Sequence, residues 1–129
     1  MKKPEDAKAL KGRSGLARWG RALGCSVDGF AAAWRDEAAF REECVIGAAA
    51  LAAALALPFA AGVKLLLAAG ILLVLIVEAL NSAVEAAIDR IGTDIHPLSK
   101  KAKDLGSLAV LLAIGLNVLL WGWALATLF

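Results

Sequence analysis

Charge is absent from long parts of this 129-residue chain, and that absence sets the class of protein. No Asp, Glu, Lys or Arg occurs in residues 44–63 or 105–129, and residues 65–88 carry only Glu78 and Glu85. The apolar content, 60% of the residues, therefore lies in continuous runs and is not spread evenly as in a soluble domain. Since about 20 apolar residues span the hydrocarbon core of a bilayer, the sequence predicts three membrane-spanning helices.

Cysteine is scarce, and the spacings that form metal or redox motifs are missing. Cys25 and Cys44 do not have such a spacing, and we expect no disulfide because one lies in the N-terminal segment and the other at a membrane edge. No cleavable signal peptide is visible, so we expect the first span to be retained. Gly15 and Gly20 have the spacing of a phosphate-binding loop, but the Lys-Ser/Thr pair of that loop is missing. We attribute their spacing to chance.

Positive charge is missing after the last apolar run, and its distribution predicts an orientation. Nine Lys and Arg residues precede residue 44, one follows the first apolar run, four lie around the second loop, and none follows the third run. By the positive-inside rule, the N-terminus and the second loop are cytoplasmic, and the first loop and the C-terminus face outside. A short chain divided into three spans has too little interior to enclose a site, so we expect an oligomer.

An all-α membrane protein follows from these runs, with an N-terminal amphipathic surface helix ahead of the spans. The surface helical region covers residues 6–35, and its part 6–24 is basic and moderately amphipathic, which suits a helix on an anionic membrane surface. A second helical segment, residues 27–43, is expected to run straight into the first span. We predict a single membrane domain over residues 1–129. The three spans are expected at residues 37–57, 63–91 and 99–128.

Helix ends are predicted from proline, glycine and capping residues. Pro58 disfavours helix at the residue before it, so the first span should end near Leu57. Gly92 is expected to terminate the second span, and Ser99 is a reasonable N-cap for the third.

Small and polar residues of the third span are predicted to serve helix packing. Gly106, Ser107 and Ala109 permit the close approach of another helix. Asn117 is expected to form a hydrogen bond between helices and not to take part in chemistry.

Polar side chains form one stripe on the second predicted span. At 100° per residue they fall within an arc about 100° wide, whereas the opposite side carries Ala, Leu, Val and Ile. A carboxylate near the middle of a membrane helix costs roughly 2.5–3.5 kcal/mol on insertion scales, so the stripe should face protein, water or ligand. Its members are Glu78, Asn81, Ser82, Glu85 and Asp89.

Charged residues from three segments converge at the predicted inner interface, and they suit phosphoryl transfer from a nucleotide. That reaction needs carboxylates for Mg²⁺, a cation for the phosphates and a group that orients or deprotonates the acceptor hydroxyl. Glu37 and Glu85 could hold the metal and Lys103 the phosphates. Glu78 could act on a hydroxyl that reaches in from the bilayer. Two other hypotheses stay open on the residues alone: a stripe that only joins helices, and a proton or ion path.

A twelve-residue run resembles the signature of the prokaryotic membrane diacylglycerol kinases: residues 78–89, Glu-Ala-Leu-Asn-Ser-Ala-Val-Glu-Ala-Ala-Ile-Asp. The blocks 34–43 and 102–107 agree with the same family, and the resemblance extends from about Arg18 to the last span. It implies a homotrimer of three-span chains in the bacterial inner membrane, with active sites shared between subunits. It also implies transfer of the γ-phosphate of ATP, with Mg²⁺ as cofactor, to the hydroxyl of diacylglycerol.

The resemblance further implies a role for each residue of the site. Glu78 would be the general base, while Glu37 and Glu85 would hold the metal. The residues implied in ATP binding are Arg18, Glu37, Glu85, Asp94, His96, Lys103 and Asp104. The residues implied in contacts with the lipid substrate are Arg18, Trp34, Glu78, Asn81 and Ser107. Undecaprenol is the alternative acceptor for the same kinase reaction. A non-enzymatic helical membrane protein or ion path is the alternative function of a different class. No nucleic-acid partner is expected.

Overall fold

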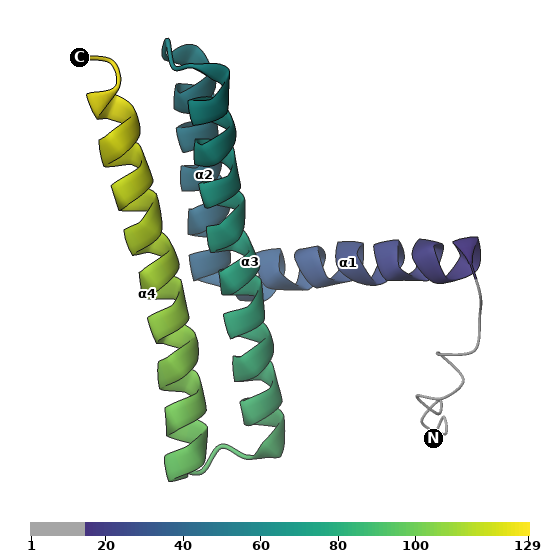
Figure 1. Cartoon of the computed structure of the whole chain (residues 1–129). Helices are drawn as coiled ribbons and strands as arrows, with labels where there is room; N and C mark the ends of the chain where they lie inside the picture. The colour runs from purple at the N-terminus through teal and green to yellow at the C-terminus, as the bar shows by residue number, and fades with distance from the viewer. Residues whose placement is uncertain (1–14) are drawn as a thin grey trace.

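The computed structural model describes residues 15–129, and every regular element within them is an α-helix. Three helices lie side by side, and the first extends sideways from them (Figure 1). The part of the predicted surface helix that precedes residue 15 lies outside the described residues. The helices are α1 (Leu16–Asp36), α2 (Ala38–Ala56), α3 (Ala61–Ile91) and α4 (Pro97–Ala126).

The first helix, α1, is amphipathic, and none of its residues is buried. Phe30 stacks on Trp34 with ring centroids 6.1 Å apart, and it meets Phe40 of α2 edge-on at 5.4 Å. An apolar face without a partner in its own chain is typical of a helix that lies on a membrane surface. The exposed apolar side chains of α1, spaced three or four residues apart, are Leu16, Trp19, Leu23, Val27, Phe30 and Trp34.

The chain bends at Glu37, so the prediction that the surface segment runs straight into the first span is wrong. Glu37 has an extended backbone, with φ −115° and ψ 103°, and it both ends α1 and precedes α2. The guanidinium of Arg41 donates through Nη1 to the carbonyls of Trp34, at 2.7 Å, and of Arg35, at 3.1 Å. The last carbonyls of a helix have no partner within that helix, and here a side chain from α2 satisfies two of them. We call this bend, residues 34–41, the elbow.

A second contact at the elbow is the ion pair between Arg35 and Asp36, whose Nε and Oδ1 atoms are 3.0 Å apart. The hydrogen bond from Arg35 lowers the pKa of Asp36. The pair is therefore fully formed above the ordinary pKa of an aspartate and is lost as the pH falls through the lowered value. Because both side chains are exposed, it contributes little to stability.

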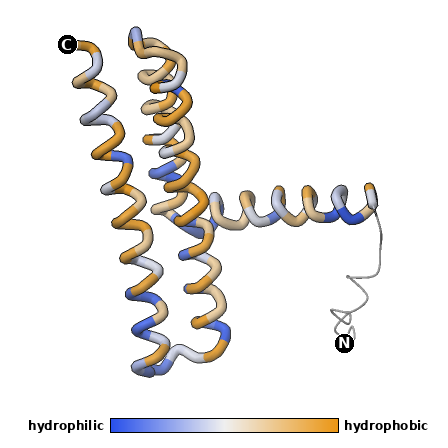
Figure 2. The backbone as a smooth tube through the Cα atoms, in the orientation of Figure 1, coloured by the Kyte–Doolittle hydropathy of each residue, from blue (hydrophilic) through white to orange (hydrophobic). Residues whose placement is uncertain are grey.

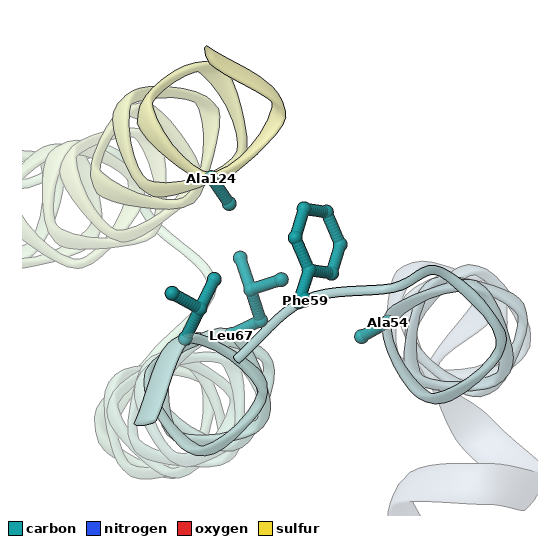
Figure 3. Close-up of a cluster of buried hydrophobic side chains, with 5 residues drawn as sticks. Ala54, Phe59, Leu67 and Ala124 are labelled. Atoms are coloured by element: carbon teal, nitrogen blue, oxygen red, sulfur yellow. The ribbon is translucent and has the colours of Figure 1, made fainter. Parts of the chain in front are cut away.

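A small apolar core joins α2, α3 and α4 at one end of the bundle, beside the turn between α2 and α3 (Figure 3). Trp121 of α4 packs edge-on against Phe59 with ring centroids 6.3 Å apart. The turn follows Ala56, in agreement with the end predicted near Leu57 from Pro58. The members of the core are Ala54, Phe59, Val63, Leu67 and Ala124.

The second turn contains one confirmed prediction and one wrong one. Gly92 follows the last residue of α3, as expected of a helix terminator. Ser99 is not the N-cap of α4, because the helix already begins at Pro97. His96 takes that place, and its Nδ1 accepts a hydrogen bond from the Leu98 N–H at 3.1 Å. Pro97 suits the first helical position because its missing N–H would have no partner there.

The contact between α3 and α4 is the most extensive in the described residues. Asn117 donates through Nδ2 to the carbonyl of Gly70 at 2.8 Å and to that of Ala113, in its own helix, at 3.0 Å. This confirms the prediction that Asn117 forms a hydrogen bond between helices.

A second close approach of the same two helices involves Gly106. A Cβ atom on Gly106 would overlap the Oδ1 atom of Asn81, so a larger residue would displace the Asn81 amide from this position. Ser107 and Ala109 are exposed, so of the three small residues named from the sequence Gly106 makes this contact.

Among the residues described, α3 and α4 are long and apolar enough to cross a membrane, judged by length and composition. Apolar residues dominate the middle of both helices (Figure 2), and many of their large side chains are exposed. The shorter α2 does not meet the same description, because three charged residues, Arg41, Glu42 and Glu43, lie near its start. The rest of α2 is uncharged.

Candidate active site

Glu78 lies in the middle of α3 and is the one buried charged side chain in residues 15–129, with 5% of its surface exposed. The carboxylates of Glu85 and Glu37 are close enough for their charges to act on it. Glu43 of α2 lies within the same range. A carboxylate held away from water is unfavourable without a partner or a function, so its retention points to chemistry.

The predicted stripe of α3 faces the other helices, as expected. Burial falls from Glu78, which is buried, through Asn81 and Glu85, which are half-buried, to Asp89, which is exposed at the end of the helix. The opposite side of this part of α3 is exposed and apolar. It consists of Ala79, Leu80, Ala83, Ala86 and Ala87.

Asn81 serves the helix contact and Glu85. Its Nδ2 atom donates to Oε1 of Glu85 over a long 3.5 Å, and its Oδ1 atom is buried against Gly106 without a hydrogen-bond partner. The geometry therefore makes Asn81 a contact between α3 and α4.

A polar cleft of about 410 Å³ opens where α3, the second turn and α4 meet. We call it the nucleotide cleft, after the ATP contacts that the sequence resemblance implies for some of its residues, and Figure 2 shows the hydrophilic residues at this end of the bundle. The Nζ atom of Lys103 lies 2.6 Å from Oδ1 of Asp89 and so links α4 to α3. Within α4, Lys100 pairs with Asp104 one turn further on. Four residues implied in ATP binding line the cleft: Asp94, His96, Lys103 and Asp104.

The remaining predicted site residues lie outside this cleft. Glu37 and Trp34 are at the elbow, and Ser107 is exposed on α4. Arg18 lies in the first turn of α1, at the end of that helix that is remote from the bundle (Figure 1). A single chain therefore does not bring Arg18 to the nucleotide cleft.

An apolar groove of about 660 Å³ runs along α2, α3 and α4. Glu43 lies in its wall, and one of its carboxylate oxygens, Oε2, is buried without a hydrogen-bond partner. Val74, one turn before Glu78, lines the same groove, as do Ile114 and Trp121. The groove therefore presents an apolar surface close to the depth of Glu78.

The carboxylates of Glu37 and Glu85 fit a magnesium ion that arrives with a nucleotide. Within residues 15–129 no three His, Cys, Asp or Glu side chains gather into a cluster able to hold a metal alone. Mg²⁺ is commonly bound by one or two carboxylates together with waters and substrate phosphates. Both glutamates are half-buried and lie within electrostatic range of Glu78, which suits such a shared arrangement.

Sequence reasoning missed two features of this region. It placed Asp89 in the polar stripe but did not predict its bond to Lys103, because a bond between residues fourteen positions apart across a turn leaves no periodic signal. It gave Glu43 no role, because six residues, about 1.7 helical turns, separate it from Glu37 and would place the two acids on different faces of a continuous helix.

Comparison with known proteins decides between the alternatives. The model of the prokaryotic diacylglycerol kinase family matches residues 24–125. The chain belongs to that family. It is 48% identical over 108 residues to the diacylglycerol kinase of Escherichia coli K12, covering 84% of this chain and 88% of that protein. It is 45% identical over 112 residues to the diacylglycerol kinase of Pseudomonas aeruginosa PAO1, covering 87% and 91%.

A more distant diacylglycerol kinase, from Helicobacter pylori 26695, is 39% identical over 117 residues, which is 89% of this chain and 90% of that protein. Membership of the prokaryotic diacylglycerol kinase family makes the chain a lipid kinase. The family supports the enzyme and not the two non-enzymatic hypotheses for the polar stripe.

Proposed function

We propose that this kinase transfers the γ-phosphate of MgATP to the free hydroxyl of diacylglycerol and so forms phosphatidic acid. The observation that carries the proposal is the buried Glu78 in the middle of α3, with a cleft lined by charged residues at the end of that helix and an apolar groove that reaches Val74, one turn before Glu78. A lipid kinase has to bring a charged donor and an apolar acceptor to one carboxylate, and these two cavities suit the two substrates.

The nucleotide cleft would bind the donor. Lys103 provides a cation for the phosphates, Asp104 stands next to it, and Asp94 and His96 line the turn that faces the nucleoside. Glu37 and Glu85 would hold Mg²⁺, which would neutralise the negative charge that develops on the phosphates during transfer. The phosphates would extend along α3 from Asp89 towards Glu85, about 6 Å deeper and on the side of Glu78.

The apolar groove would hold the acyl chains of the acceptor, with its hydroxyl turned towards Glu78. Glu78 accepts the hydroxyl proton as the oxygen attacks the γ-phosphorus, and the bond from that phosphorus to the leaving oxygen of ADP breaks. Trp34, Asn81 and Ser107 would border the acceptor and the phosphate. Low water access around Glu78 favours transfer to the lipid over transfer to water.

We further propose that the active form is a homotrimer of three-span chains, with α2 as the first span. The position of Arg18 supports sites shared between subunits, because α1 extends away from its own bundle (Figure 1). The apolar surfaces of α3 and α4 that remain exposed in one chain supply area for contacts with other copies and with lipid. The protein would lie in the bacterial inner membrane, with the N-terminus in the cytoplasm and the C-terminus outside.

The test is Mg²⁺- and ATP-dependent phosphorylation by the purified protein in detergent micelles, with diacylglycerol and undecaprenol offered separately. Glu78→Gln should lower turnover by at least about 100-fold, because it keeps the shape of the side chain but removes the proton acceptor. MgATP binding should persist in the variant. Asp28→Asn, an acid-to-amide change on exposed α1, should leave turnover unchanged.

Phosphatidic acid from the parent and not from Glu78→Gln is the expected result. Phosphorylation of undecaprenol in preference to diacylglycerol would replace the proposed acceptor and keep the mechanism. Failure of folded, trimeric protein to phosphorylate either lipid would overturn the proposal.

A further inference from the structure

The bond between Lys103 and Asp89 is the one ion pair in residues 15–129 that joins two different helices. Its Nζ–Oδ1 distance is 2.6 Å, and both residues line the nucleotide cleft. The side chains are 41% and 60% exposed. Water reaches both partners, so the pair is open to exchange with an incoming phosphate.

Stability does not explain this pair. Exposed ion pairs contribute little to the free energy of folding. The same two helices are already held by the contact of Asn81 with Gly106 and by the hydrogen bond from Asn117 to Gly70. What the bond does determine is where the Lys103 ammonium lies, since an untethered lysine side chain samples many rotamers.

The other carboxylate whose charge reaches Lys103 is that of Glu85, one helical turn deeper on the same face of α3. Glu85 receives only the long 3.5 Å hydrogen bond from Asn81, so it has capacity for a further donor. Asp104, the neighbour of Lys103 in sequence, is already paired with Lys100. A Lys103 released from Asp89 would therefore turn towards Glu85.

We infer that Asp89 is a positioning residue that holds the Lys103 ammonium at the mouth of the nucleotide cleft and keeps it from occupying Glu85. The inference rests on the proposed function, in which Glu85 binds Mg²⁺ and Lys103 binds phosphate. With Asp89 in place, Lys103 binds phosphate one helical turn away from the site where Glu85 binds Mg²⁺. Without it, the ammonium of Lys103 competes with Mg²⁺ for the same carboxylate.

The experiment measures how much Mg²⁺ supports binding of a fluorescent ATP analogue to the full-length protein in micelles. Asp89→Asn should raise the Mg²⁺ concentration at half-maximal binding about three- to fivefold, within the range expected for the loss of an exposed ion pair. The melting temperature, the oligomeric state and the KM for diacylglycerol should not change. Asp89→Glu should restore most of the parent's Mg²⁺ dependence. Asp28→Asn should need the same Mg²⁺ concentration for half-maximal binding as the parent.

A double variant identifies the route of the effect. In a Lys103→Ala background, Asp89→Asn should cause no further shift, because no ammonium remains to occupy Glu85. An equal shift in that background would overturn the inference, since Asp89 would then act on the metal itself. No shift in the single variant, or a shift to lower Mg²⁺, would overturn it as well. Asp89→Ser is measured alongside, so that a folding defect in one variant does not decide the result.

These outcomes separate the inference from the proposed function. If Asp89→Asn shows the expected Mg²⁺ shift but the parent phosphorylates no diacylglycerol, the proposed function alone is refuted. A parent that makes phosphatidic acid, with no Mg²⁺ shift in Asp89→Asn, would refute the role of Asp89 alone.

Discussion

Two contacts between an asparagine and a glycine determine how closely α3 and α4 approach. Asn117 lies against Gly70 and Asn81 against Gly106, so each helix supplies one glycine and one amide. Interhelical amides and small residues are common where helices pack in a membrane, because close backbone approach replaces the hydrophobic effect as a source of attraction. The contact at Gly106 lies on the same helix turns as the site, since Asn81 also bonds Glu85.

Gly106→Ala should lower both stability and turnover. The added methyl group would overlap the Asn81 amide, and overpacking of this kind costs about 1–3 kcal/mol of the free energy of unfolding. Equilibrium unfolding in mixed detergent micelles measures the loss, and the lipid phosphorylation assay measures turnover.

Gly115→Ala is the matched control on the same helix, because a Cβ at Gly115 meets no atom within 4 Å. From helix propensity, Gly115→Ala should raise the free energy of unfolding by about 0.5–1 kcal/mol. Equal stability changes in the two alanine variants would show that the Asn81–Gly106 contact does not limit the approach of the helices.

Among the elements, the elbow turns a surface helix into a bundle helix without proline or glycine. Its geometry depends on Arg41, which reaches back to the carbonyls of Trp34 and Arg35. Hydrogen bonds from a charged donor are stronger than neutral ones, and these two satisfy groups that would otherwise face the end of α1. The elbow also places Glu37 near the buried acid of α3.

Arg41→Ala should loosen the elbow and make α1 more mobile relative to the bundle. Limited trypsin digestion should then cut after Arg35 about three to ten times faster, because the loss of charged hydrogen bonds raises the population of open forms. Arg41→Lys retains the charge but not the planar guanidinium. Its rate of cleavage after Arg35 should fall between those of the parent and of Arg41→Ala. A cleavage rate in Arg41→Ala equal to that of the parent would mean that other contacts hold the bend.

The helices and the polar stripe could be predicted from the sequence, and the elbow could not. The stripe follows from helical periodicity alone, because Glu78 and Glu85 share a face that apolar residues avoid. The elbow lies in a stretch of ordinary helix formers, and its cause is a side chain up to seven positions further on. The cap of α4 was misplaced for a similar reason, since Ser99 is the stronger capping residue by preference but His96 makes the hydrogen bond.

For the whole molecule, the number of spans decides on which side each terminus lies. Three spans, with α2 as the first, place the termini on opposite sides of the membrane. Two spans, α3 and α4 alone, would place both termini on the same side. The apolar part of α2 is shorter than α3 or α4, so the two arrangements need a direct test.

Alkaline phosphatase, which is active only outside the cytoplasm, distinguishes these topologies when fused after different residues. With three spans, fusions after Ala60 and Phe129 should be active and a fusion after Asp94 inactive. With two spans and a cytoplasmic N-terminus, the pattern reverses at all three positions. A cytoplasmic reporter fused at the same positions serves as the control and should give the opposite signals.

The core shown in Figure 3 lies at one end of the bundle, and the site lies towards the other. Towards the site, α3 and α4 are joined by the close approach of the Asn81 amide to Gly106 and by the Asp89–Lys103 ion pair. In the proposed mechanism, the phosphates of the nucleotide draw on Lys103, one partner of that pair. A stronger bond between Asp89 and Lys103 would therefore hold the two helices more firmly and release the lysine to the nucleotide less readily.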